Sequence, residues 1–155
     1  MNGPVLQPDL QSCLMCDDVR QEMNGKFILI GIVDTLGCAT LPMRHPRFFV
    51  VTRWCNGQGV FTQKTRILKP DQQSLLASGQ DIPVRLNDPV STATNIELFV
   101  NSTFTEPGTH WIEVLLDGEM MVRTPLRVHL VKPSGQQAAP PAPPPDPPPS
   151  YPHHD

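Results

Sequence analysis

Two cysteines three positions apart, Cys13 and Cys16, are the residues with the most obvious chemical potential. A Cys-x-x-Cys pair can be half of a zinc site or a thiol redox pair. A zinc knuckle needs a tight turn between its ligands, whereas Leu14-Met15 favours an extended strand, in which residues three apart point to opposite faces. No second Cys-x-x-Cys follows. We therefore expect buried thiols, with a metal site as the alternative, and we predict no metal or cofactor for this chain.

A second candidate is a basic segment, because the chain has no acidic residue between Asp34 and Asp71. Strands predicted over 47–55 and 60–69 would form a basic hairpin, residues 47–69, whose possible anion-binding side chains are Arg47, Arg53, Lys64 and Arg66. Basic residues interleaved with aromatic ones suit nucleic acids or other polyanions. Residues 71–119 are acidic, however, and could neutralise this hairpin within the fold. Polyanion binding is therefore the alternative hypothesis, and we do not expect nucleic acid as the main partner.

The proline-rich tail is a third candidate. Residues 133–155 hold most of the 19 prolines, cannot bury a core and are predicted to be disordered and biased towards polyproline II. Within them, Pro148, Pro149 and Tyr151 form a Pro-Pro-x-Tyr pattern, a possible peptide motif of the kind that aromatic grooves of WW type bind. A solubilising or spacer role is the competing interpretation.

No other group of residues favours catalysis. Asp17 and Asp18 are adjacent in a predicted strand, so they face opposite ways and are better placed to pair with Arg20 or Lys26. The histidines are scattered, and the chain has neither a nucleophile motif nor a glycine-rich phosphate loop. We therefore predict no catalytic residues and no enzymatic activity.

The predicted fold is organised around residues 27–33, which have no polar side chain and are rich in β-branched residues. This pattern predicts a strand that is buried on both faces. Asn24-Gly25 lies just before it, between two apolar runs, and is a strong signal for a tight hairpin. The strand would therefore pair with its predecessor in the chain.

About eight short strands are predicted in total, with turn signals between them and at most one short helix, over residues 70–79. The fold class is all-β, an antiparallel β-sandwich of immunoglobulin-like type, with a small barrel as the alternative closure. The predicted core side chains include Phe27, Leu29, Phe48, Val50 and Trp54. We divide the chain into a flexible segment (1–11), a sandwich domain (12–132) and a disordered tail (133–155). The strands are expected at residues 13–22, 26–36, 47–55, 60–69, 82–87, 95–104, 110–116 and 119–131.

Charge and composition narrow the choice of partner and compartment. The net charge of -3 and the pI near 5.9 give no general reason to bind nucleic acid or an anionic membrane. Residues 1–12 lack the basic and apolar parts of a signal peptide, and no stretch could span a membrane. We therefore expect a cytoplasmic protein with reduced cysteines.

Two segments resemble one known family. Residues 16–32, from Cys-Asp-Asp-Val-Arg to the apolar strand, and residues 106–128, from Glu-Pro-Gly-Thr-His-Trp to Pro-Leu-Arg-Val, are similar to the opening and closing hairpins of a bacterial family, domain of unknown function 6941. The resemblance covers roughly residues 12–131 and implies a small, mainly β, cytoplasmic protein. The family supplies no activity or catalytic residues. We therefore expect a non-enzymatic protein-interaction or structural module with an unknown protein partner and an undefined oligomeric state.

Overall fold

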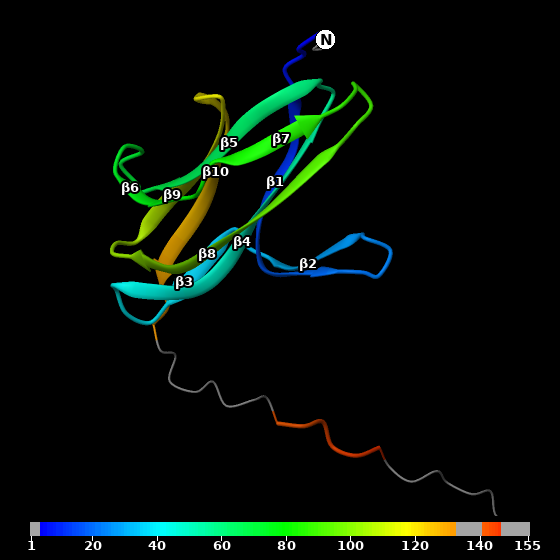
Figure 1. Ribbon diagram of the computed structural model, residues 1–155. Coiled ribbons are helices and arrows are strands. Elements are labelled where there is room, and N and C mark those ends of the chain that lie inside the picture. Colours follow the sequence, from blue (N-terminus) through cyan, green and yellow to red (C-terminus); the bar gives the residue numbers. More distant parts are fainter. Residues whose placement is uncertain (1–3, 133–140, 147–155) are drawn as a thin grey trace, which may run out of the picture.

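The computed structural model describes residues 4–132 and 141–146 and contains ten strands and no helix within them (Figure 1). Residues 141–146 have no regular secondary structure, and the rest of the predicted tail lies outside the described residues. The strands are β1 (Asp9–Gln21), β2 (Phe27–Ile32), β3 (Thr35–Cys38), β4 (Met43–Cys55), β5 (Gly59–Leu68), β6 (Leu75–Ser78), β7 (Ile82–Leu86), β8 (Ala93–Phe104), β9 (Gly108–Leu116) and β10 (Glu119–Leu130).

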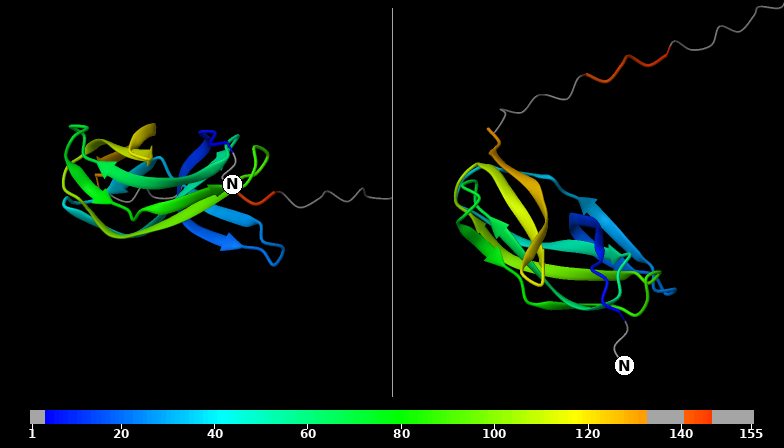
Figure 2. Two further views of the ribbon diagram at one scale, coloured as in Figure 1. Left: turned by 45° about the horizontal axis from the view of Figure 1, so that its top comes forward. Right: turned by 90° about the horizontal axis from the view of Figure 1, so that it is seen from above.

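The strands form two sheets that pack as the layers of a sandwich (Figure 2). The four-stranded sheet has the order β2-β1-β4-β8, and the six-stranded sheet has the order β3-β10-β9-β5-β6, with β7 also paired to β5. All strand pairs are antiparallel except β10 with β3. The prediction of an all-β, largely antiparallel sandwich is confirmed.

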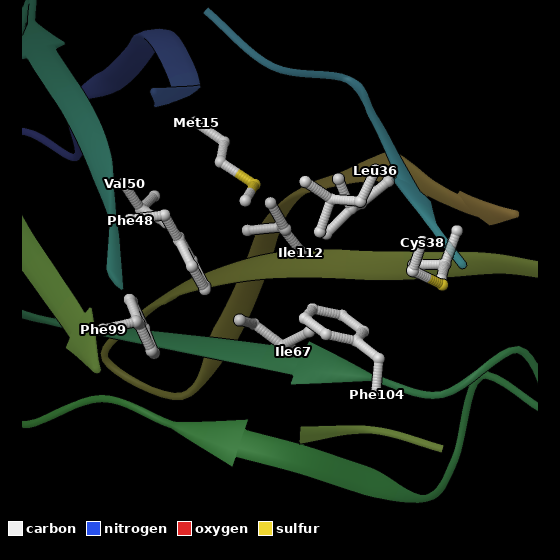
Figure 3. Packing of buried hydrophobic residues seen from close by; sticks show 11 residues of the cluster. Met15, Leu36, Cys38, Phe48, Val50, Ile67, Phe99, Phe104 and Ile112 are labelled. Carbon is white, nitrogen blue, oxygen red and sulfur yellow. The ribbon is translucent and has the colours of Figure 1, made fainter. Parts of the chain in front are cut away.

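Alternating side chains from the two sheets fill the space between them. In one apolar cluster, Phe48 on β4 stacks on Phe99 on β8, with ring centroids 5.1 Å apart, and Met15 and Ile112 pack nearby (Figure 3). A second cluster surrounds Trp54, which is fully buried. The predictions that Phe48, Val50 and Trp54 belong to the core are confirmed.

The strand predicted to be buried on both faces is an exposed edge strand. The Asn24-Gly25 turn is confirmed, since the Glu22 amide donates to the Lys26 carbonyl and Gly25 has φ of 89°. Yet β2 pairs with β1 alone, and the hairpin projects from the sandwich (Figures 1 and 2). The burial prediction for residues 27–33 and the core assignments of Phe27 and Leu29 are wrong, because periodicity reports apolar character and not whether other elements cover a strand.

The predicted helix at residues 70–79 is also wrong. Asp71 accepts hydrogen bonds from the amides of Gln73 and Ser74 at 2.9 and 2.7 Å, and Gln72 has φ of 61°. A short acidic side chain that bonds to nearby amides stabilises a turn at the expense of a helix. The chain then continues into β6, which pairs with β5.

Strand boundaries near the N-terminus also differ from the prediction. The segment 1–11 was expected to be flexible, but the backbone of Leu6 bonds to Gln58 and β1 begins at Asp9. The strand predicted over residues 26–36 is divided into β2 and β3, which belong to different sheets. The chain therefore crosses from one layer to the other between residues 32 and 35.

Candidate functional site

The main candidate site is the β1–β2 hairpin, by which we mean β2, the part of β1 that pairs with it and the turn between them, residues 16–32. The exposed fractions of Phe27, Ile28, Ile30 and Ile32 are 38, 44, 44 and 62 %. Successive strand residues point to opposite faces, so apolar side chains are exposed on both faces of β2. Single exposed apolar residues are normal, but a contiguous group on a projecting element is typical of an interaction surface.

Gly31 is a backbone position that the hairpin requires. Its φ is 68°, and a Cβ atom placed there would lie 2.4 Å from Oδ2 of Asp17 on the neighbouring strand. Glycine is the residue that takes this conformation without steric cost. It interrupts the regular extension of β2 at the end nearest the sandwich, where the hairpin leaves the body of the sheet.

The outer edge of β2 has an open backbone. The Glu22 amide donates a hydrogen bond to the Lys26 carbonyl, and the antiparallel register continues through Arg20 opposite Ile28. Hydrogen-bonded and non-hydrogen-bonded pairs alternate in such a ladder, so the amide and carbonyl groups of Phe27 and Leu29 point away from β1. No strand pairs with this edge in the part of the chain that the structure describes.

A groove of about 550 Å³ separates the hairpin from the outer face of the four-stranded sheet. Its apolar side chains are Phe27 and Leu29 from β2, Leu14 from β1 and Val51 from β4. The volume is in the range of small-molecule and peptide pockets, and the lining is mostly apolar, as in such pockets. The groove and the open edge of β2 therefore adjoin each other.

Two cationic residues, Lys26 and Arg53, also contribute to the lining of this groove. Nε of Arg53 donates to Gln11 at 2.9 Å and Nη1 donates to Thr94 at 3.4 Å, so both hydrogen-bond partners of this guanidinium are neutral. Neither Lys26 nor Arg53 forms a salt bridge within the described residues. The groove thus combines an apolar lining with positive charge that forms no salt bridge with a carboxylate of the described residues.

The four predicted anion-binding residues do not share one hairpin. β4 carries Arg47 and Arg53 and pairs with β1 and β8, whereas β5 carries Lys64 and Arg66 and pairs with strands of the other sheet. The predicted hairpin of residues 47–69 is therefore wrong, because the inward side chains of the two strands face each other across the core. Polyanion binding itself stays a prediction.

Three of these four cations also have acidic partners. Arg47 lies 3.1 Å from Asp18, Lys64 lies 3.8 Å from Asp81, and Arg66 lies 3.2 Å from Glu113. Glu113 is buried and also binds Arg123 at 3.2 Å. The expectation that residues 71–119 neutralise the basic segment is met for Lys64 and Arg66, whereas Arg47 pairs with Asp18 of β1. Arg53 is the one of the four that forms no salt bridge among the described residues.

Asp18 has the structural role expected of it, because it binds Arg20 at 2.9 Å as well as Arg47. Burial by itself would raise the pKa of Asp18, but hydrogen bonds from Arg20 and the Val19 amide, with the two nearby positive charges, lower it. The pKa of this carboxyl is therefore below its ordinary value. Asp18 is an ionised member of a surface ion-pair cluster.

The two cysteines of the Cys-x-x-Cys motif point to opposite faces of β1. Cys13 packs against the core, while Cys16 follows the core residue Met15 and so faces the other way. Burial raises the pKa of the Cys13 thiol to about 11 and also raises that of Cys16. All four cysteines are free thiols, and no group of residues within 4–132 and 141–146 has the arrangement of a metal site.

The remaining predicted features lie apart from the hairpin or outside the described residues. His110 is buried, with Nδ1 at 3.2 Å from the Gly108 carbonyl, whereas His129 is exposed. Pro148, Pro149 and Tyr151 lie outside the described residues. Among the residues that are described, no helix is long and apolar enough to cross a membrane.

Sequence reasoning missed Lys26 and Gln63. Lys26 follows the Asn-Gly turn, and no sequence signal indicates that it lines the same groove as Arg53. Phe61, Gln63 and Thr65 are the alternate residues of β5 that point into the sandwich. This alternation could have identified Gln63 from the sequence as a buried polar residue. Its Oε1 accepts from Thr52 and Trp54 at 2.8 Å each.

Comparison with known proteins identifies the family. Residues 11–129 match the model of the Family of unknown function (DUF6941). The match covers nearly the whole sandwich, and the chain belongs to this family. No curated protein matches the chain.

Proposed function

We propose that this chain is a non-enzymatic protein-interaction module of the cytoplasm that binds a partner protein through the β1–β2 hairpin. One observation carries the proposal: β2 exposes apolar side chains on both faces and an open backbone edge, and no other described element covers them. Unprotected edge strands are normally avoided or blunted by charges, proline or a covering element. Phe27–Ile32 contains no charge and no proline.

The rest of the molecule supports a binding role. The inner side chains are packed and the ion pairs at Asp18 and Glu113 have structural partners. Burial raises the pKa of the Cys13 and Cys16 thiols, and a buried thiol with a raised pKa is a poor nucleophile. Free thiols agree with a reducing compartment, which supports the cytoplasmic assignment.

The test is capture of binding partners from a lysate of the source cell with the full chain as bait. An Ile28→Lys/Ile30→Lys variant adds charge at two of the three exposed isoleucines of β2. A matched control, Val60→Lys/Val90→Lys, makes the same chemical change at residues that are 65 and 90 % exposed elsewhere. We expect the same partner to be captured by wild type and control and lost with the hairpin variant.

Equal capture by all three proteins would overturn the proposal. Retention on heparin resin at physiological salt that disappears in an Arg53→Glu/Arg66→Glu variant would favour polyanion binding instead.

A further inference from the structure

We infer that the partner supplies an extended segment which pairs as an added strand with the open edge of β2, and that this segment alternates apolar residues with an acidic side chain bound by Lys26 and Arg53. The inference rests on the proposed function and names the chemistry of the partner. Strand addition to an exposed sheet edge is a common mode of peptide recognition, in which the backbone supplies affinity and side-chain pockets supply specificity.

The backbone of β2 is suited to such an addition. The amides and carbonyls of Phe27 and Leu29 point to the open edge, as the alternation from the Glu22–Lys26 pair requires. These two residues lie between the turn at Gly25 and the irregular conformation at Gly31. The regular part of the edge is therefore short, and it matches a short linear segment better than a long strand.

The side chains define what the added segment must carry. Residues of an added strand that lie beside Phe27 and Leu29 on the same face point towards the groove, where Leu14 and Val51 complete an apolar surface. Residues between them lie beside Ile28 and Ile30 on the opposite face, which is also apolar and exposed. Neighbouring side chains on one face of a sheet contact one another. We therefore expect apolar residues at the alternate positions that face the groove, and apolar residues are also tolerated at the positions between them.

The charge of the groove adds the acidic side chain. Lys26 and Arg53 come from different strands, line the same groove and have no carboxylate partner among the described residues. A carboxylate in the groove would be attracted by both positive charges, and the guanidinium of Arg53 would donate a charge-assisted hydrogen bond to it. An apolar segment without an acid would partly cover these charges and gain no such bonds.

A second copy of this chain fits the edge less well than a partner segment. Phe27–Ile32 has no acidic residue, so a copy of β2 added to this edge offers Lys26 and Arg53 no carboxylate within the strand. The irregular backbone at Gly31 also shortens the stretch over which two copies could pair. Self-association is therefore an outcome that the experiment must recognise and separate.

The experiment is selection of random linear peptides displayed on phage against the full chain, followed by affinity measurement on synthetic copies of the selected peptides. We expect selected sequences to alternate apolar residues and to contain Asp or Glu at one preferred position. A Lys26→Glu/Arg53→Glu variant should bind these peptides at least roughly tenfold more weakly, because it removes two positive charges near the acidic side chain and adds two negative ones. Replacing the peptide's acid by Lys should restore binding to this variant.

Two matched controls separate the specific effects from general ones. Arg85→Glu/Arg127→Glu makes the same change in net charge at exposed residues of β7 and β10, and it should leave peptide affinity unchanged. Leu29→Pro removes an amide that points to the open edge, whereas Leu29→Ala keeps that amide and removes a similar amount of side chain. We expect Leu29→Ala to weaken binding, because it removes part of the apolar lining of the groove, and Leu29→Pro to abolish it, with both variants folded by circular dichroism.

Selected peptides without an acidic preference, or equal binding by Leu29→Pro and Leu29→Ala, would overturn the inference. Dimerisation in sedimentation velocity that Leu29→Pro abolishes would assign the edge to a second copy and would also overturn it. If lysate capture still depends on Ile28 and Ile30 in either case, the proposed function stands and only the strand-addition model is wrong. If that dependence is absent as well, both fail.

Discussion

The centre of the sandwich and the β1–β2 hairpin differ in which side chains are buried and which are exposed. In the centre, Gln63 from one sheet is buried and its Oε1 accepts hydrogen bonds from Thr52, Trp54 and Asn95 of the other sheet, at 2.8, 2.8 and 3.0 Å. In the hairpin, apolar side chains of a six-residue strand are exposed. The interior accommodates a polar group, and the surface leaves apolar groups uncovered.

This difference shows which arrangement is complete within the described chain. A buried polar group is tolerated when its hydrogen bonds are made, and Gln63 has partners that tie the two sheets together. An uncovered apolar strand has no equivalent compensation, because its contact with water remains unfavourable in the folded chain. The hydrogen bonds of Gln63 are therefore made within the fold, whereas the hairpin gains from a partner.

The largest expected effect is on stability and comes from the core. Trp54→Ala should lower the free energy of unfolding by about 3–5 kcal/mol, because it removes a fully buried side chain and leaves a cavity. Phe27→Ala in the hairpin should lower it by less than about 1 kcal/mol, since its side chain is already 38 % exposed. Urea titration followed by fluorescence or circular dichroism measures both. Equal losses would mean that the hairpin is part of the core.

A smaller effect is expected at the polar centre. Gln63→Leu leaves the donors of Thr52, Trp54 and Asn95 without their acceptor and should cost roughly 2–3 kcal/mol, because unsatisfied buried donors are expensive. Gln63→Glu keeps an acceptor of the same length and serves as the matched comparison, read at a pH where its carboxyl is protonated. Unchanged stability in Gln63→Leu would show that the inter-sheet hydrogen bonds contribute nothing.

His110 should make the sandwich sensitive to acid. Burial lowers its pKa and Lys69 acts in the same direction, while the hydrogen bond to Gly108 and the charge of Glu106 oppose the shift. The unfolded chain then binds more protons below the ordinary value of 6.5, so stability is lost as the pH falls through 6.5 towards the folded pKa. The slope from one proton is at most about 1.4 kcal/mol per pH unit. Urea titrations between neutral and mildly acidic pH should show a flatter pH dependence in His110→Gln, and an identical slope would contradict this origin.

The smallest expected effect on stability is the most informative about the hairpin. Ile28→Lys/Ile30→Lys should change the free energy of unfolding by less than about 1 kcal/mol, because both side chains are already 44 % exposed. The same variant should lose its partner in the capture experiment. A folded variant that no longer binds would show that the exposed isoleucines serve recognition and not stability. Strong destabilisation by the double change would show instead that the hairpin contributes to the stability of the fold.

Much of the fold could be predicted from local pattern. Alternation in residues 47–55 identified Phe48, Val50 and Trp54 as inward-facing because strand side chains alternate regardless of context. Asn24-Gly25 identified a hairpin because its backbone conformation is a property of those two residues. The turn at Asp71 was not predicted, because Pro70 and Gly79 lie where a helix would begin and end. The Asp71 side chain instead accepts hydrogen bonds from amides of its own loop.

The candidate site could be predicted only in part. The amino-acid sequence by itself determined that residues 27–33 are apolar, extended and joined to the preceding strand by a tight turn. Only the tertiary structure decided that β2 lies at a sheet edge, that Lys26 and Arg53 line one groove, and that β4 and β5 belong to different sheets. The physical reason is that side-chain type and spacing fix local conformation and apolar character, whereas exposure and the meeting of distant residues depend on which elements pack against one another.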